Sequence, residues 1–122
     1  MDLKNKVAIV TGAQRGIGES IALKLAELGV KVAVTDITKQ PCEEVVEKII
    51  DKGGEAFAFK LDVVNEPEVK NVVAQVKEKF GRIDILVNNA GICSTEEAED
   101  TSKIDKIVDV DIKGVLYCSK AV

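Results

Sequence analysis

Histidine and tryptophan are absent from this sequence of 122 residues, and aromatic residues make up only 3% of it. Without histidine, the chain lacks the side chain that most often serves as a general base and as a metal ligand. The shortage of aromatic rings means that the core has to be aliphatic, and the hydrophobic content of 46% is sufficient for that. These absences exclude histidine-based catalysis and argue against a metal site.

Cysteine is also sparse, and the 21 acidic residues outnumber the 17 basic residues. Cys42, Cys93 and Cys118 form no CxxC pair, so the sequence predicts reduced thiols instead of disulfides or a zinc site. The formal net charge of −4 argues against binding of nucleic acid by a basic surface. No apolar run is long enough to cross a membrane, and the N-terminal stretch lacks an apolar signal segment. We therefore expect a soluble, cytoplasmic protein that binds neither nucleic acid nor membranes.

Short apolar runs alternate with longer segments of helical period, which predicts alternating strands and helices. The run at 7–10 is continuous, as is typical of a strand that is buried on both faces. The predicted strands are residues 7–10, 30–35, 56–61 and 83–87. The predicted helices are 17–28, 41–52, the segment between the N-cap Asn65 and Gly81, and a last helix from 101 onward, after a loop at 90–100.

This alternation predicts the fold class. Consecutive parallel strands need crossover connections, and helices that form those crossovers pack on the faces of the sheet. The length is enough for one domain and too short for two. We predict an α/β fold with an open parallel sheet and helices on both faces.

The sequence TGAQRGIG, at 11–18, joins the first predicted strand directly to a helix. A glycine-rich turn at a helix N-terminus forms an anion site, because backbone N–H groups and the helix dipole point at the ligand. In this interpretation Gly12 permits the tight turn, Gly16 lets the backbone approach a pyrophosphate, and Gly18 lets helix and strand pack closely. The alternative is a turn that needs glycine only for its positive φ angles.

Asp36 ends the second predicted strand and favours the dinucleotide interpretation. A carboxylate at this position can accept hydrogen bonds from an adenosine ribose and would repel a 2′-phosphate. The alternative is that Asp36 is an N-cap for the helix at Pro41. Arg15 favours NADP, since a cation in the turn can meet a 2′-phosphate, but the carboxylate would occupy the ribose edge itself. We therefore expect NAD in preference to NADP.

Together, TGAQRGIG, Asp36, LDV at 61–63 and NNAG at 88–91 resemble the short-chain dehydrogenase/reductase family, of the classical type. The resemblance covers the whole chain, which corresponds to only the N-terminal half of the family domain. It implies a Rossmann-type sheet of strand order 3-2-1-4, truncated to half of the full domain. Residues 1–122 would then be the NAD-binding N-terminal half of that domain.

The resemblance also implies roles for individual residues. Glycine-turn residues would hold the pyrophosphate, an acidic residue the ribose, and the later motifs the adenine and the cofactor's path. The pyrophosphate residues are Gly12, Gly16, Ile17 and Gly18, and Arg15 in the same turn is a further cofactor-binding candidate. The ribose residue is Asp36, the adenine residues are Asp62 and Val63, and the residues along the cofactor's path are Asn88, Ala90 and Gly91. Asn88 and Asn89 can also be interpreted as a polar strand end that satisfies buried backbone groups, and this role is compatible with contact to the cofactor.

The chain departs from the family where catalysis is concerned. Asp111 stands where the family has an asparagine, and an ionised carboxylate can accept but not donate hydrogen bonds. The family's catalytic serine and its tyrosine and lysine, in a Y-x-x-x-K pattern, have no counterpart in these residues. Tyr117 and Lys120 are three positions apart, and we interpret them as ordinary helix residues. We predict no catalytic residue in this chain.

Three functions remain open. In the first, the complete protein is an oxidoreductase that transfers hydride between NAD(P) and an alcohol or ketone, and this chain alone is inactive. In the others, the chain is a non-catalytic folding fragment or self-assembling module, or one half of an enzyme completed in trans. An apolar strand at 83–87 with a free edge, together with the last helix, predicts a homodimer or larger homo-oligomer. The sequence does not identify a substrate.

Overall fold

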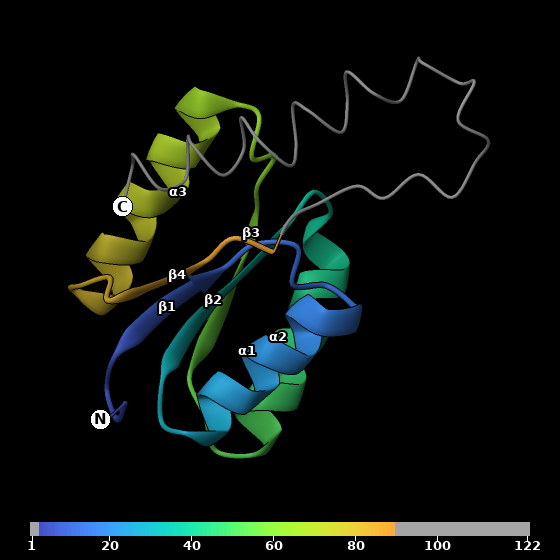
Figure 1. Cartoon of the computed structure of the whole chain (residues 1–122), viewed down its shortest axis with the longest axis vertical. Coiled ribbons are helices and arrows are strands. Elements are labelled where there is room, and N and C mark those ends of the chain that lie inside the picture. The colour runs from blue at the N-terminus through green and yellow to red at the C-terminus, as the bar shows by residue number, and fades with distance from the viewer. Residues whose placement is uncertain (1–2, 90–122) are drawn as a thin grey trace.

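The structure is a computed structural model and describes residues 3–89 (Figure 1). Strands and helices alternate along these residues, as the hydrophobic pattern predicts. The strands are β1 (Val7–Val10), β2 (Lys31–Asp36), β3 (Ala56–Lys60) and β4 (Ile85–Val87). The helices are α1 (Gly16–Glu27), α2 (Lys39–Asp51) and α3 (Glu66–Phe80). The predicted helix from 101 onward lies outside the described residues.

The four strands form one parallel sheet in the order β3-β2-β1-β4. This order confirms the predicted 3-2-1-4 arrangement. Figure 1 shows α1 and α2 on one side of the sheet and α3 on the other. Because the strands are parallel, their carboxyl ends all lie at the same end of the sheet, where open α/β sheets bind their ligands.

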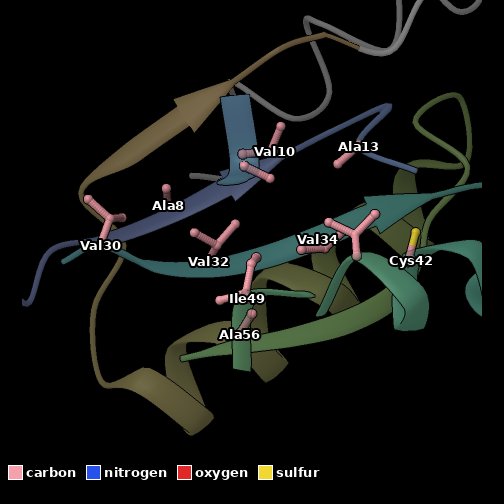
Figure 2. Close-up of a cluster of buried hydrophobic side chains, with 11 residues drawn as sticks. Ala8, Val10, Ala13, Val30, Val32, Val34, Cys42, Ile49 and Ala56 are labelled. Carbon is pink, nitrogen blue, oxygen red and sulfur yellow. The ribbon is translucent and has the colours of Figure 1, made fainter. Parts of the chain in front are cut away.

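The two faces of the sheet carry two separate aliphatic clusters, because successive side chains of a strand point to opposite faces. Val7 and Ile9 pack toward α3, and Ala8 and Val10 pack toward α1 and α2. Figure 2 shows how side chains of β1 and β2 meet Cys42 and Ile49 of α2. β1 is fully buried and β2 is buried except at its two end residues, which explains why these two runs are largely apolar.

Helix boundaries follow the predicted signals with small shifts. Gly29 and Gly81 have φ angles of 90° and 83°, so both helix-ending turns use the left-handed conformation that glycine tolerates. α2 begins at Lys39, two residues before the predicted start, and Pro41 lies within its first turn. That turn has no intrahelical partner for its N–H groups, so a proline costs little there.

The N-cap of α3 also forms as predicted, with one difference. The side chain of Asn65 accepts a hydrogen bond from the backbone N–H of Glu68, at 3.2 Å. In the usual capping box, the glutamate would accept from the N-cap backbone N–H. Here Glu68 instead accepts from the backbone N–H of Asp62, at 2.9 Å. The cap therefore also fixes the turn between β3 and α3.

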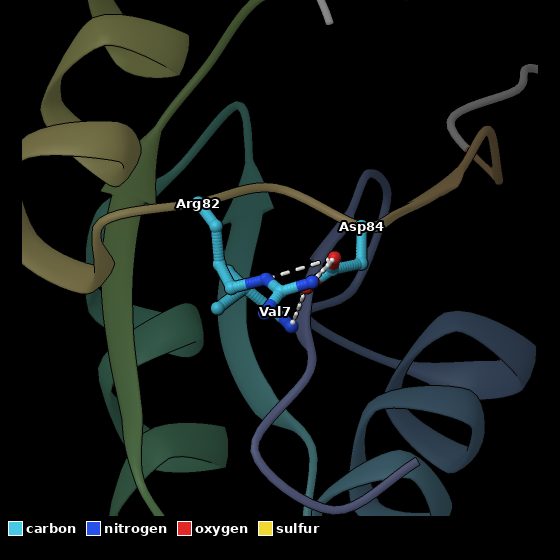
Figure 3. Close-up of polar contacts among 3 residues, drawn as sticks. All are labelled: Val7, Arg82 and Asp84. Atoms are coloured by element: carbon cyan, nitrogen blue, oxygen red, sulfur yellow. Dashed lines mark hydrogen bonds and ion pairs between the residues drawn. The ribbon is translucent and has the colours of Figure 1, made fainter. Parts of the chain in front are cut away.

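β4 is shorter than the predicted strand 83–87, because Asp84 pairs with β1 through its side chain (Figure 3). Its carboxylate accepts a hydrogen bond from the backbone N–H of Val7 at 2.9 Å, while its own N–H donates to the Val7 carbonyl. The guanidinium of Arg82 also donates to this carboxylate. Hydrogen bonds from Arg82, and then from Val7, lower the pKa of Asp84 below its ordinary value.

We expect Asp84→Asn to weaken the acid dependence of stability. A carboxyl whose folded-state pKa is depressed contributes stability above its unfolded-state pKa, about 3.8. That contribution is lost as the pH falls through the folded-state pKa. Urea unfolding at pH 7 and pH 3 should show a smaller difference in midpoint for Asp84→Asn than for the unmodified chain. Asp51→Asn, at the exposed end of α2, is the control; an equal effect there would contradict the assignment.

Candidate functional site

The glycine turn between β1 and α1 adopts the conformations that the sequence predicts. Gly12 and Gly16 have φ angles of 63° and 61°, which other residues adopt only with strain. A methyl group on Gly18 would collide with the carbonyl of Gly12 and stand 2.5 Å from Nδ2 of Asn89. Gly12 and Gly16 thus provide the turn, and Gly18 provides the close approach of helix and strand.

Hydrogen bonds tie this turn to the end of β4. The side-chain amide of Asn89 donates to the carbonyl of Gly12 at 3.1 Å. The backbone N–H of Asn89 donates to Oγ1 of Thr11 at 3.0 Å, and that hydroxyl in turn donates to the carbonyl of Val87 at 3.3 Å. Thr11 is buried, so these contacts satisfy a polar group inside the core.

Asp36 lies beside the turn, at the end of β2. One carboxylate oxygen accepts a hydrogen bond from the backbone N–H of Gln14 at 3.2 Å, and the other accepts from Ile37 at 2.8 Å. The N-cap of α2 is Thr38, so the alternative role of Asp36 as the helix cap is wrong. A carboxylate has about four acceptor positions, and these two bonds leave room for a diol to donate.

Cys42 packs close to this carboxylate but does not contribute reactive chemistry. It is a free cysteine, fully buried at the start of α2. Burial, and then the charges of Asp36 and Glu43, raise the pKa of the Cys42 thiol to about 12. A thiol with this pKa is neutral at physiological pH and is a poor nucleophile.

The residues after β3 lie at the same end of the sheet as the glycine turn and Asp36. The N–H of Leu61 donates to the carbonyl of Asp36 at 2.8 Å, which continues the pairing of β2 and β3 past their ends. Asp62 accepts a hydrogen bond from the backbone N–H of Val64, and Val63 is buried. Both residues predicted near the adenine therefore follow the strand that neighbours Asp36.

Other predicted residues lie at the border of the described chain or beyond it. Asn88 is exposed at the end of β4. Ile17 and Arg15 are exposed at the start of α1, where Arg15 is the N-cap residue. The remaining residues singled out in the sequence lie outside the described residues: Ala90, Gly91, Cys93, Asp111, Cys118, Tyr117 and Lys120.

The turn fits a phosphate-bearing nucleotide on two observations. Gly16 is exposed and has no atom within 4 Å of the position where a side chain would begin, so its backbone is open to a ligand. Oε1 of Gln14 is buried and accepts no hydrogen bond from the part of the chain that the structure describes. An acceptor of this kind costs free energy until a donor arrives. Within the same residues, no cluster of side chains is arranged to hold a metal ion.

Asn89 satisfies a backbone carbonyl at the strand ends, as the interpretation of the two asparagines as a polar strand end predicts, whereas Thr35 was missed as a structural residue of the site. Thr35 is buried, donates from Oγ1 to the carbonyl of Val10 at 2.9 Å, and accepts at its own carbonyl from the N–H of Ala13. The signal in the sequence is a polar residue at or just after the end of an otherwise apolar strand. Such residues join the strand ends that carry the glycine turn and Asp36.

A family model described as short chain dehydrogenase matches residues 6–122. The chain belongs to the short-chain dehydrogenase family. Solved structures agree with this membership: a hydroxysteroid dehydrogenase from Escherichia coli aligns with a TM-score of 0.93 at 34% identity. That alignment covers 98% of this chain and 52% of the other. The Rossmann-type arrangement predicted for this short-chain dehydrogenase chain is thereby confirmed.

Curated relatives of the short-chain dehydrogenase chain are about twice as long. The 3-oxoacyl-(acyl-carrier-protein) reductase FabG of Staphylococcus epidermidis is 46% identical over 121 residues, which cover 97% of this chain and 50% of that protein. An uncharacterized oxidoreductase of Thermotoga maritima is 43% identical over 122 residues, covering 98% of this chain and 48% of that protein. The chain spans about half the length of these relatives. No helix among residues 3–89 has the length and apolar character to span a membrane.

Proposed function

We propose that residues 1–122 are the NAD-binding N-terminal half of a cytoplasmic oxidoreductase of the short-chain dehydrogenase family. One contact carries the proposal: the hydrogen bond of 3.2 Å from the backbone N–H of Gln14 to the carboxylate of Asp36. It joins the glycine turn, which suits a pyrophosphate, to the carboxylate that suits the adenosine ribose. Two elements that are separate in the sequence thus form one surface of the right chemistry.

Each part of this surface has its own task in binding. The backbone N–H groups of Gly16, Ile17 and Gly18 at the start of α1 are proposed to face the pyrophosphate, with open space at Gly16 and the turn set by Gly12. Asp36 accepts hydrogen bonds from the ribose hydroxyls, and Asp62 and Val63 flank the adenine. Asn88 lines the path of the cofactor at the end of β4, followed by Ala90 and Gly91. Bound NAD supplies the hydride chemistry, which in the complete protein acts on an alcohol or ketone.

A chain of only these 122 residues is expected to bind NAD without oxidising alcohols. The pattern of serine, tyrosine and lysine that handles the proton in the family is not among these residues. The chain therefore supplies the adenosine side of the site. The remaining residues would belong to the same polypeptide or to a second one that completes the enzyme in trans; in the alternative, these residues function as a binding module.

The same chain is proposed to self-associate. Among the described residues, β4 pairs with β1 on one side, and no described strand lies along its other edge. An edge of this kind pairs readily with another strand. Two copies related by a two-fold axis would cover both edges at once. The last helix, which lies outside the described residues, is proposed as the second part of this interface.

We expect the chain to bind NAD at least about tenfold more tightly than NADP, because Asp36 repels a 2′-phosphate and Arg15 is exposed to solvent. Asp36→Ala should reduce this ratio to about threefold or less. Isothermal calorimetry with both nucleotides measures the ratio. Asp51→Ala removes the same charge at a distance and should leave the ratio unchanged. Tighter binding of NADP by the unmodified chain would show that Arg15 outweighs Asp36 and would overturn the assignment.

A further inference from the structure

A cavity lies at the opposite end of the sheet from the glycine turn. It has a volume of about 940 Å³ and opens where α1 and α2 end, beside Lys31, the first residue of β2. In Figure 1 this end of the molecule is at the bottom, away from the start of α1. None of the residues assigned above to the nucleotide lines it. Its volume lies within the range of sites that bind small molecules.

Backbone hydrogen bonds hold the rim of this cavity in place. The N–H of Asn5 donates to the carbonyl of Gly29 at 2.9 Å, which fixes the N-terminal segment against the turn after α1. The N–H of Gly54 donates to the carbonyl of Ile49 at 3.0 Å and closes the turn after α2. The main chain therefore holds two of the turns that border the cavity, while side chains form its floor and rim.

The floor of the cavity is apolar. It consists of Leu23, Ala26, Val30 and Ile49, which come from both helices and the start of β2. A side chain on Gly54 would approach Cγ2 of Ile49 to 2.7 Å, so the glycine keeps this floor open. An apolar floor favours a ligand with a hydrocarbon body.

The rim carries positive charge. Four lysines, Lys4, Lys24, Lys31 and Lys52, face two glutamates, so the lining has a net charge of +2 in a chain whose net charge is −4. Lys24 and Lys31 each lie 3.7 Å from a glutamate, and the side chains of these pairs are well exposed except that of Lys31, which is 32% exposed. Pairs of this kind are weak and exchange easily for another anion.

The lysines are not needed to satisfy the end of α1. Backbone N–H groups of Leu28, Gly29 and Val30 already donate to carbonyls of its last turn. The ends of α1 and α2 carry partial negative charge, which opposes any anion, and a doubly charged one more strongly than a singly charged one. The lysines have to outweigh this repulsion, so an anion of single charge suits the cavity better than one of double charge.

We propose that this cavity binds a small organic carboxylate, with its hydrocarbon body on the floor and its carboxylate among the lysines at the rim. The proposal does not depend on the proposed function, because the two sites share no residue. A ligand here would contact the ends of the two helices whose beginnings adjoin the glycine turn and Asp36.

Hexanoate is the probe, and backbone amide resonances of the ¹⁵N-labelled 122-residue chain are the readout. We expect the amides of Gly29, Gly53 and Gly54 to shift, with a dissociation constant of about 1 mM. The double variant Lys24→Gln, Lys52→Gln should weaken binding about tenfold. Lys70→Gln, Lys77→Gln is the matched control, since it removes the same charge from α3, and Lys70, like Lys24, pairs with a glutamate on its own helix.

Three results would overturn the proposal. One is the absence of shifts at these glycines at about 20 mM hexanoate. Another is equal weakening in the two double variants. The third is equal binding of hexan-1-ol, which would show that the cavity recognises the hydrocarbon and not the charge. Shifts at Gly12 and Gly16 on addition of NAD report the nucleotide site separately, so failure of one proposal leaves the other testable.

Discussion

Gly18→Ala should unfold much of the chain at temperatures that the unmodified protein tolerates. The added methyl group would meet the carbonyl of Gly12 and the amide of Asn89, and the first of these is backbone that cannot turn away. Forcing extra volume into a packed region costs about 1–3 kcal/mol, and we expect the upper end here. For a domain of this size the melting temperature should fall by about 10 °C. NAD binding should weaken at least about tenfold, because the Gly12 carbonyl and the start of α1 must separate.

Gly53→Ala is the control for this variant. Gly53 has a φ angle of 86° but open space where a side chain would begin, so alanine there introduces only backbone strain, about 1–2 kcal/mol. Its position after α2 is far from the glycine turn, so NAD affinity should be unchanged. If Gly18→Ala melted like the unmodified chain and bound NAD equally well, the close approach at Gly18 would not matter for the site.

Ile85→Lys should shift the chain from an oligomer to a monomer. Ile85 lies in β4, opposite Ala8 of β1, and packs partly buried against the cluster that β1 and β2 form with α1 and α2. A lysine there places a charge at the proposed interface, and charged side chains on an edge strand oppose pairing with a second chain. Sedimentation velocity should show a dissociation constant at least about tenfold higher. The folded state should also lose about 2 kcal/mol, because a half-buried apolar side chain is replaced by a charge.

Ile50→Lys is the control for the added charge. Ile50 is 55% exposed on α2, and a lysine there adds the same charge away from the edge of the sheet. It should leave both the oligomeric state and the stability nearly unchanged. A stable, folded monomer of the unmodified chain at micromolar concentration would contradict the proposed assembly.

The sequence was sufficient to predict the order of elements and the position of the glycine turn, because both depend on local patterns. Continuous apolar runs mark β1 and β2, and the glycines after the helices mark their ends. The sheet order came from the family resemblance, and the structure confirms it. The conformations of Gly12 and Gly16 were likewise predictable, since positive φ angles favour glycine.

The contacts that assemble the site were not predictable, because they join residues far apart in the chain. Asn89 and Gly12 are 77 positions apart, and nothing in the local pattern shows that the amide of Asn89 reaches the Gly12 carbonyl. The shortening of β4 has the same origin, because Asp84 pairs with Val7 over an equal separation. Apolar periodicity identifies buried residues but does not identify the partner of a polar side chain.

The most direct test of the nucleotide site is a titration of the ¹⁵N-labelled chain with ADP-ribose, which contains the adenosine and pyrophosphate but no nicotinamide. We expect the largest amide shifts at Gly12, Gln14, Gly16 and Ile37, and we expect NAD to give the same pattern with a similar affinity. If these amides did not shift while the spectrum showed that the chain is folded, the proposed nucleotide site would be contradicted.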